Sequence, residues 1–198
     1  MHYLSEIIIT FGYIGIFTTI FAESGFLLGF FLPGDSLLFT VGLLAAENYF
    51  SITVLVVGSI IAAILGDSFG YYCGKRFGPK IFKHEDSLLF RKQHVEETRL
   101  FFEKYGKKAI ILARFVPIVR TFTPIMAGVG KMEYKTFLAY NIVGGMLWAG
   151  GFLLAAYFLG TKVPGIEKYT TYIIIGIIIL SFAPFARKVL QIIRSKIK

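Results

Sequence analysis

The sequence predicts an all-α integral membrane protein, an inverted repeat of two opposed re-entrant helical hairpins with transmembrane helices and a cytoplasmic amphipathic helix. Three observations support this fold class. First, 56% of the 198 residues are hydrophobic and 21 are Phe, which is too apolar for a soluble globular domain. Second, prolines and charged residues interrupt two long apolar stretches. Third, basic residues gather between and after these stretches and no stretch is polar enough for another domain, so residues 1–198 form one membrane domain.

The first apolar stretch, residues 7–46, is long enough for two membrane elements, because a spanning helix needs about 20 apolar residues. This stretch is interrupted after Glu23 and again at Pro33 and Gly34. The second interruption predicts a hairpin that enters and leaves the membrane on one side. The elements expected in this half are a span, a re-entrant hairpin and a second span, over about 5–22, 24–46 and 50–72.

Residues 74–108 form an extramembrane segment that is rich in Lys and Arg. Because cytoplasmic loops carry an excess of these residues, we expect this segment to face the cytoplasm. Leu88, Val95, Phe102 and Tyr105 recur near helical spacing, which suggests an amphipathic helix lying on the membrane surface. An ordinary solvated helical loop explains the same pattern equally well.

The next apolar stretch, residues 109–130, contains two prolines and two arginines. Non-helical backbone at membrane depth is tolerated only where protein or a wet cavity surrounds it, so we expect a second re-entrant hairpin. Full crossing would also place the basic C-terminal tail outside, against the positive-inside rule. The hairpin instead returns the chain to the cytoplasm, and two spans over about 136–160 and 170–186 then lead to a cytoplasmic C-terminus.

The two halves of this layout have the same order, a hairpin followed by a span, over 24–72 and 109–159. The first pair starts outside and ends inside, and the second pair runs in the opposite direction. Such an inverted repeat is typical of transporters, which bind their substrate near the midplane where broken helices meet. The sequence support is Phe-Leu-Pro in one half against Phe-Val-Pro in the other, with Gly42 and Gly128 following.

Four ionisable residues lie inside the apolar stretches: Glu23, Asp35, Arg114 and Arg120. Each costs roughly 3 kcal/mol at the centre of a bilayer, so four uncompensated charges would cost about 10 kcal/mol. This cost predicts a buried polar site that binds an anion. The alternative is that the arginines only pair with the two carboxylates and hold the hairpins together.

Arg114 and Arg120 are the candidate phosphate ligands, because the planar guanidinium fork matches phosphate and carboxylate oxygens. Pro117 between them removes a backbone donor and bends the chain, so both side chains can point into one cavity. Glu23 and Asp35 are the candidate counter-ions and proton-coupling residues. The alternatives are a turn role for Asp35 after Pro33-Gly34 and a place near the headgroups for Glu23 at a helix end.

Other residues are expected either to support the charged site or to lie outside it. Asp67 lies a few residues before the basic segment, so we expect it at the cytoplasmic interface, paired with Lys75 or Arg76. Asn141, Gly144, Gly145 and Trp148 share one face of the following span. There the glycines allow close helix packing, Asn141 can hydrogen-bond the second hairpin, and Trp148 is equally consistent with core filling and with a lid.

Several functions are disfavoured by the sequence. His2, His84 and His94 all lie outside the apolar stretches, so no intramembrane histidine is available for a membrane phosphatase or a metal site. Cys73 is the only cysteine, which argues against a metal cluster. The basic residues flank membrane segments rather than a groove-reading module, which argues against nucleic-acid binding. We expect no enzyme activity, no metal and no cofactor.

An ordered set of motifs resembles the DedA family, also called the SNARE-associated or VTT-domain family. The resemblance covers roughly residues 10–160. Lys75 departs from it, because many relatives are expected to have arginine there, but it keeps the charge. The motifs are Glu23 with Pro33-Gly34-Asp35, the segment Gly-Tyr-Tyr-Cys-Gly-Lys-Arg-Phe-Gly at 70–78, Arg-Phe-Val-Pro-Ile-Val-Arg at 114–120, Ala127-Gly128, and Asn141 with Gly144 and Trp148.

The resemblance implies a lipid transporter of the bacterial cytoplasmic membrane, whose functional acids and arginines correspond to Glu23, Asp35, Arg114 and Arg120. Family members are linked to recycling of undecaprenyl phosphate and to flipping of phospholipids such as phosphatidylethanolamine. Two arginines suit a phosphomonoester without an amine, so we expect proton-coupled movement of undecaprenyl phosphate from the outer to the inner leaflet. A phospholipid flippase or scramblase is the alternative, and a lipid-phosphate phosphatase is the third candidate.

Overall fold

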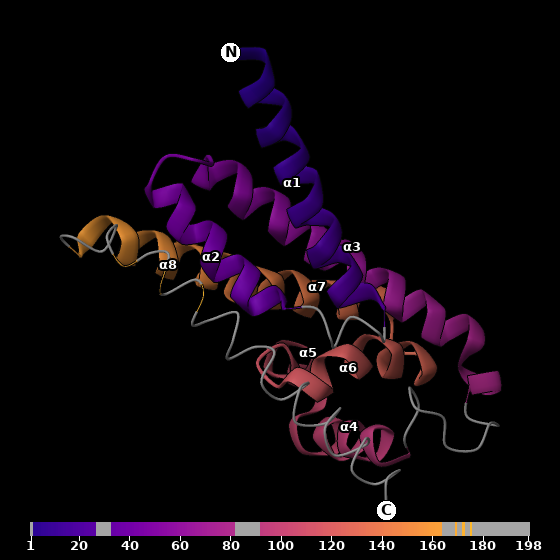
Figure 1. Cartoon of the computed structure of the whole chain (residues 1–198). Coiled ribbons are helices and arrows are strands. Elements are labelled where there is room, and N and C mark those ends of the chain that lie inside the picture. Colours follow the sequence, from indigo (N-terminus) through magenta and orange to yellow (C-terminus); the bar gives the residue numbers. More distant parts are fainter. Residues whose placement is uncertain are drawn as a thin grey trace, which may run out of the picture.

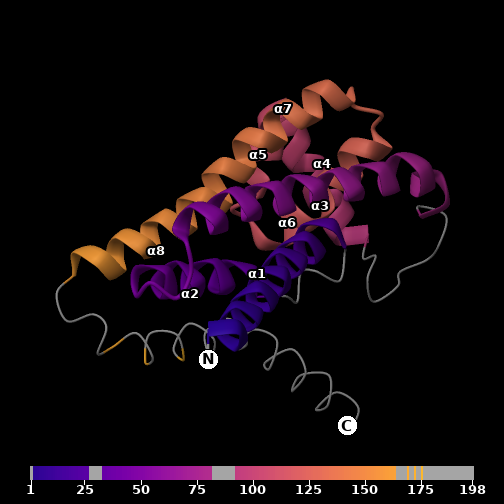
Figure 2. The same cartoon turned by 90° about the horizontal axis from the view of Figure 1, so that it is seen from above.

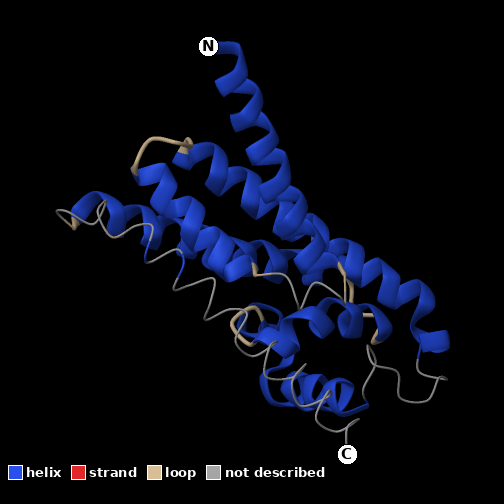
Figure 3. Ribbon diagram, in the orientation of Figure 1, coloured by secondary structure: helices blue, strands red, loops and turns tan. Residues whose placement is uncertain are grey.

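The computed structural model describes residues 2–26, 33–81 and 92–163 and the single positions 169, 172 and 175. Within these residues every regular element is a helix (Figure 3), so the all-α prediction is confirmed. Most of the expected span over 170–186, the basic tail and most of the loop over 162–168 lie outside the described residues. Residues 27–32 of the first predicted hairpin and residues 82–91 of the basic segment also lie outside them.

The first half of the chain forms helices α1 (His2–Gly25), α2 (Gly34–Ala46) and α3 (Ile52–Ile81). Part of α3, Ile52–Phe77, is long and apolar enough to cross a membrane. The 13 residues of α2 extend only about 20 Å, which is less than the roughly 30 Å of a bilayer core. A short apolar helix of this kind cannot cross by itself.

The second half begins with α4 (Lys92–Tyr105) and a 3₁₀ turn, η2 (Gly106–Lys108), which leads into α5 (Ala109–Ala113). The chain then breaks before α6 (Pro117–Val129). Val116 has an extended backbone, with φ −118° and ψ 105°, because a residue that precedes proline avoids helical angles. Pro117 then begins the new helix, where its missing N–H costs nothing.

The last described part is one long helix (Figure 2), made of α7 (Tyr134–Gly145), a π-helical turn η3 (Met146–Gly150) and α8 (Gly151–Lys162). Tyr134–Lys162 is the second segment in the described part of the chain that is long and apolar enough to cross a membrane. A π-helical turn inside an α-helix is uncommon and is frequently found at functional sites.

Each short helix packs on the long helix of the other half (Figure 1): α2 lies along α8, and α6 lies along α3. Glycine permits both approaches. A Cβ atom on Gly42 of α2 would come within 2.7 Å of the Cβ of Ala156 on α8, and one on Gly128 of α6 would overlap the carbonyl oxygen of Tyr71 on α3. The two halves are therefore joined by this reciprocal packing.

One face of α3 carries exposed apolar side chains at helical spacing, a pattern that fits contact with lipid rather than water. The opposite face packs on α1 and α6. The exposed side chains are Val54, Val57, Ile61, Leu65, Phe69 and Tyr72.

The core has two buried clusters, and α3 contributes to both. Ala63 belongs to the cluster formed with α1, α2 and α8, and Tyr71 belongs to the cluster near α4, α6 and α7. Asp67 lies one helical turn from each of these residues, at the junction of the two clusters. This junction is where the charged residues meet.

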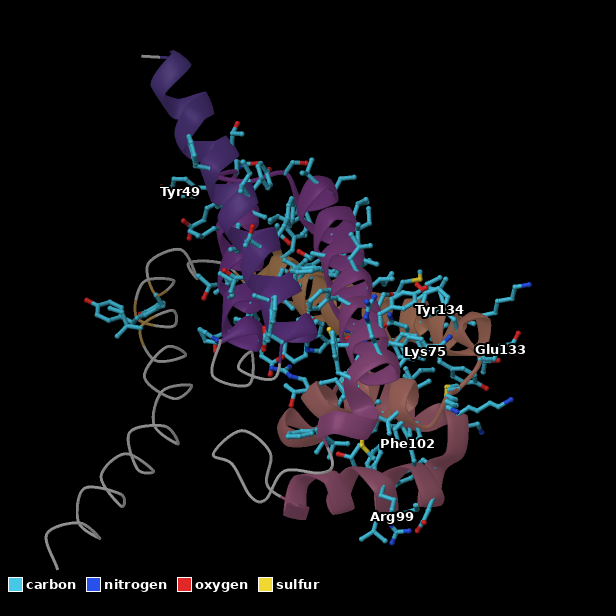
Figure 4. The ribbon with its side chains drawn as sticks, turned by 90° about the vertical axis from the view of Figure 1, so that its right-hand side faces the viewer. Tyr49, Lys75, Arg99, Phe102, Glu133 and Tyr134 are labelled. Atoms are coloured by element: carbon cyan, nitrogen blue, oxygen red, sulfur yellow. The ribbon has the colours of Figure 1, made fainter. Side chains whose placement is uncertain are left out.

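The helix in the basic segment packs against the protein. Phe102 of α4 lies against the second cluster, while Arg99 lies on the side that faces away (Figure 4) and pairs with Glu103. Four residues separate Arg99 from Glu103, as expected on an exposed helix face. The place of α4 relative to a membrane surface stays a prediction.

Candidate functional site

Charged side chains from different helices meet in one buried cluster. Glu23 comes from the end of α1, Asp35 from the first turn of α2 and Asp67 from the middle of α3. Arg114 follows α5, and Arg120 lies in the first turns of α6. A small cavity, with space for about one water molecule, is lined by Glu23, Ser24, Asp67, Arg114, Arg120 and Trp148. The break before Pro117 therefore brings both arginines to one cavity, as the sequence predicts.

Arg120 joins the last turn of α1 to the first turn of α2. Its Nη2 pairs with Oε1 of Glu23, and its Nη1 donates to Oδ1 of Asp35 at 2.9 Å. The exposed fraction of the side chain is 1% for Glu23, 13% for Arg120 and 43% for Asp35. Glu23 is thus buried in the protein, and Asp35 is the most exposed member of this group.

Arg114 is buried and has a different set of partners. Its Nη2 pairs with Oδ2 of Asp67 and donates to Oδ1 of Asn141 at 2.5 Å. Asn141 in turn donates from Nδ2 to the backbone carbonyl of Ile64 at 3.1 Å, which fixes the orientation of its amide. Gly144 leaves room for Arg114, because a Cβ atom there would lie 2.9 Å from its Cδ. The pairing with Glu23 and Asp35 therefore holds for Arg120 alone.

The expected pairing of Asp67 with Lys75 or Arg76, outside the site, is wrong, because Asp67 pairs with Arg114. Asp67 is only 6% exposed and belongs to the site. It lies ten residues before Phe77, the end of the apolar segment, which is about 15 Å along a helix and about half of a bilayer core. The free-energy cost of placing a charge in the bilayer singles out Glu23 and Asp35 as site residues. The same cost applies to Asp67, so the sequence already contained the evidence for its place in the site.

Trp148 links the two arginines to Asp35. Its indole Nε1–H donates to Oδ1 of Asp35 at 2.7 Å. The guanidinium carbons of Arg114 and Arg120 lie 5.7 Å and 5.3 Å from the indole centroid, within the range of cation–π attraction. The side chain is only 2% exposed, so Trp148 is part of the site and not only core filling.

Gly34 is needed because Glu23 occupies the space beside it. A Cβ atom at Gly34 would overlap the Glu23 carboxylate. Pro33 precedes α2 directly, with φ −85° and ψ 57°, and so lies outside the helix. The Pro33-Gly34-Asp35 motif thus starts α2, lets Glu23 approach the backbone and presents Asp35 to Arg120.

The described site contains three carboxylates and two guanidinium groups. Its formal charge is −1 when all five are ionised. Each guanidinium already has a carboxylate partner, which removes most of the cost of burying it. An anion that enters can replace a carboxylate at one of the arginines, and Asp35 is the partner with the most exposed side chain.

Comparisons with known proteins identify the family of this chain. The VTT domain model matches residues 32–158. Protein DedA of Escherichia coli K12 is 44% identical over 199 residues, covering 98% of this chain and 89% of that protein. The uncharacterized membrane protein Rv0364 of Mycobacterium tuberculosis H37Rv is 47% identical over 184 residues, covering 92% of this chain and 80% of that protein. No solved structure matched the chain. The chain therefore belongs to the VTT-domain, or DedA, family of membrane proteins.

Proposed function

We propose that this protein moves undecaprenyl phosphate from the outer to the inner leaflet of the bacterial cytoplasmic membrane, for reuse in cell-envelope synthesis. The family is linked to membrane lipid transport. The observation that carries the proposal is the pairing of Arg120 with two carboxylates, the buried Glu23 and the half-exposed Asp35. A guanidinium that already binds carboxylate oxygens has the fork geometry that a phosphate requires.

The architecture supports alternating access around this site. In this proposal the two short helices, α2 and α6, serve as the inner arms of two opposed re-entrant hairpins. Their packing supports it, because each lies on the long helix of the other half. In inverted-repeat transporters the substrate binds near the midplane, between such broken elements. The cavity has space for about one water molecule, so the headgroup enters when Asp35 and Arg120 separate.

Proton coupling follows from the charges of the site. A phosphate adds negative charge to a cluster that already has one more carboxylate than guanidinium. A buried charge without a partner is costly, so a displaced carboxylate takes up a proton when the lipid binds. When the lipid leaves on the inner side, the carboxylate pairs with arginine again and releases the proton to the cytoplasm.

A phospholipid flippase or scramblase is the second candidate, and one observation favours it. The site has one more carboxylate than guanidinium. The extra carboxylate could pair with an amine, as in the headgroup of phosphatidylethanolamine. The two substrates differ in this amine and in having a phosphomonoester or a phosphodiester. Transport of each lipid by the same preparation therefore separates the two functions.

The test is reconstitution into liposomes with undecaprenyl phosphate in the outer leaflet. An added impermeant phosphatase reports how much lipid remains outside, and an impermeant amine reagent reports phosphatidylethanolamine. We expect the parent protein to move undecaprenyl phosphate to the inner leaflet, where the phosphatase cannot reach it. Arg120→Ala should leave all of the lipid accessible to the phosphatase. Transport of phosphatidylethanolamine alone would support the second candidate. Phosphate release without added phosphatase would show an enzyme instead.

A further inference from the structure

We propose that Trp148 binds the lipid headgroup directly, through its indole N–H. In this inference, which rests on the proposed function, Oδ1 of Asp35 marks the position that a headgroup oxygen takes in the loaded site. The carboxylate of Asp35 is thus a built-in substitute for the ligand, and Trp148 changes its hydrogen-bond acceptor when the lipid binds.

The geometry around Oδ1 of Asp35 carries this inference. That single oxygen accepts two hydrogen bonds, from Nε1 of Trp148 at 2.7 Å and from Nη1 of Arg120 at 2.9 Å. Two converging donors, one of them cationic, form an arrangement that suits any anionic oxygen. A phosphate oxygen at the same point would receive both bonds without movement of either donor.

Burial determines which partner leaves. The donors are enclosed, with 2% of Trp148 and 13% of the Arg120 side chain exposed, whereas 43% of the Asp35 side chain is exposed. Asp35 also stands in the first turn of α2, directly after Pro33 and Gly34. When Asp35 leaves, two buried donors lose their acceptor, and an unsatisfied buried donor is costly. The vacated position therefore favours a new anionic oxygen.

The protein also holds Trp148 rigidly. Its side chain packs in the first buried cluster, and its ring lies beside both guanidinium groups. Its backbone belongs to the π-helical turn η3, a feature that is frequent at functional sites. A donor whose orientation is set before binding contributes to affinity, because little side-chain freedom is lost when the ligand arrives.

A packing role alone makes a different prediction. A buried tryptophan usually finds a hydrogen-bond acceptor, and Asp35 could serve only that purpose. Trp148→Phe separates the two roles, because it keeps an aromatic ring beside the arginines and removes the N–H. As a matched control, Phe158→Leu changes an exposed aromatic residue on α8 of the same long helix.

The experiment measures equilibrium binding of undecaprenyl phosphate to the full chain in nanodiscs. In the parent, Trp148→Phe loses one hydrogen bond in the empty site and one in the loaded site, so the N–H is tested in an Asp35→Ala background, where its built-in acceptor is absent. There we expect Trp148→Phe to weaken binding about tenfold, because the hydrogen bond to the charged headgroup is lost. Asp35→Ala removes a competing acceptor and a like charge, so it should bind the lipid more tightly than the parent. Phe158→Leu should bind like the parent.

A second measurement does not depend on the folding of any variant. Trp148 is the only tryptophan in the chain, so intrinsic fluorescence of the parent reports on this one indole. We expect a saturable change in its emission as undecaprenyl phosphate is added. Binding by the parent without such a change, or equal affinities of Asp35→Ala with and without Trp148→Phe, overturns the role of Trp148 and leaves the proposed function intact. A parent that binds no lipid phosphate overturns both.

Discussion

Asp67 of helix α3 and Arg114, which directly follows α5, form an ion pair in which neither side chain is more than a tenth exposed. The pair lies one helical turn from each of the two core clusters and is completed by Asn141. Arg120, by contrast, holds the half-exposed Asp35. The two arginines therefore differ in their surroundings: Arg114 is buried among its partners, and Arg120 is the one that we propose binds a headgroup.

Removing one partner of the buried pair should destabilise the protein. Asp67→Asn leaves the Arg114 charge buried without a carboxylate, which costs about 3 kcal/mol or more. The double variant Asp67→Leu, Arg114→Leu should recover much of that loss, because it removes both charges. Thermal unfolding in detergent measures this coupling. The control is Glu103→Gln, which breaks the exposed pair with Arg99 and should cost less than about 1 kcal/mol. Additive effects of the Asp67 and Arg114 changes would contradict the pairing.

Substitution of Arg120 should affect binding more than protein level. Arg120→Ala removes the contact to both carboxylates and to the headgroup, so we expect loss of lipid-phosphate binding. Arg120→Lys should restore only part of it, since one ammonium cannot reproduce a fork that serves two oxygens at once. Protein level is checked by immunoblot and binding by titration in nanodiscs. Full binding by the lysine variant would show that the fork is not needed.

Gly34→Ala should impair the site although it adds only one methyl group. The added Cβ would overlap the Glu23 carboxylate, so α2 or Glu23 must move and the contacts to Arg120 weaken. We expect lower thermal stability and weaker lipid binding. Gly15→Ala on α1 is the control, because a Cβ atom there meets nothing within 4 Å. Equal behaviour of the two variants would contradict the described approach of Glu23 to Gly34.

The topology predicted from the basic residues is testable with single cysteines in a Cys73→Ser background. Lys104→Cys reports on the segment over 74–108, and Thr161→Cys reports on the end of α8; both positions are exposed. In intact cells, we expect an impermeant thiol reagent to label the second variant only. Labelling of Lys104→Cys without permeabilisation would contradict the cytoplasmic placement and the inverted repeat that depends on it.

Glu23 and Asp35 should couple lipid movement to the proton gradient. Glu23→Gln and Asp35→Asn remove the groups that gain and lose the proton, so we expect lipid still to bind and its movement to become independent of pH. The measurement is transport into proteoliposomes with and without an imposed gradient. If the parent ignores the gradient, or if the neutral variants respond as the parent does, the carboxylates act only as counter-ions to Arg120.

The sequence by itself determined the local features of this protein. Apolar length indicated the helices, Pro117 predicted the chain break, and the cost of burying charge identified Glu23 and Asp35 with both arginines. These features depend on neighbouring residues and on the transfer of a side chain out of water, so they can be read from a single stretch of chain.

Only the tertiary structure decided which charges meet. Asp67 appeared peripheral because a basic segment follows it, yet α3 continues as a helix to Ile81 and carries Asp67 to the centre of the fold beside Arg114. The hydrogen bond from Trp148 to Asp35 likewise depends on how α8 packs along α2. Pairing between residues that are far apart in the chain is set by the relative placement of helices, which glycine contacts and core packing decide, and no single segment contains that information.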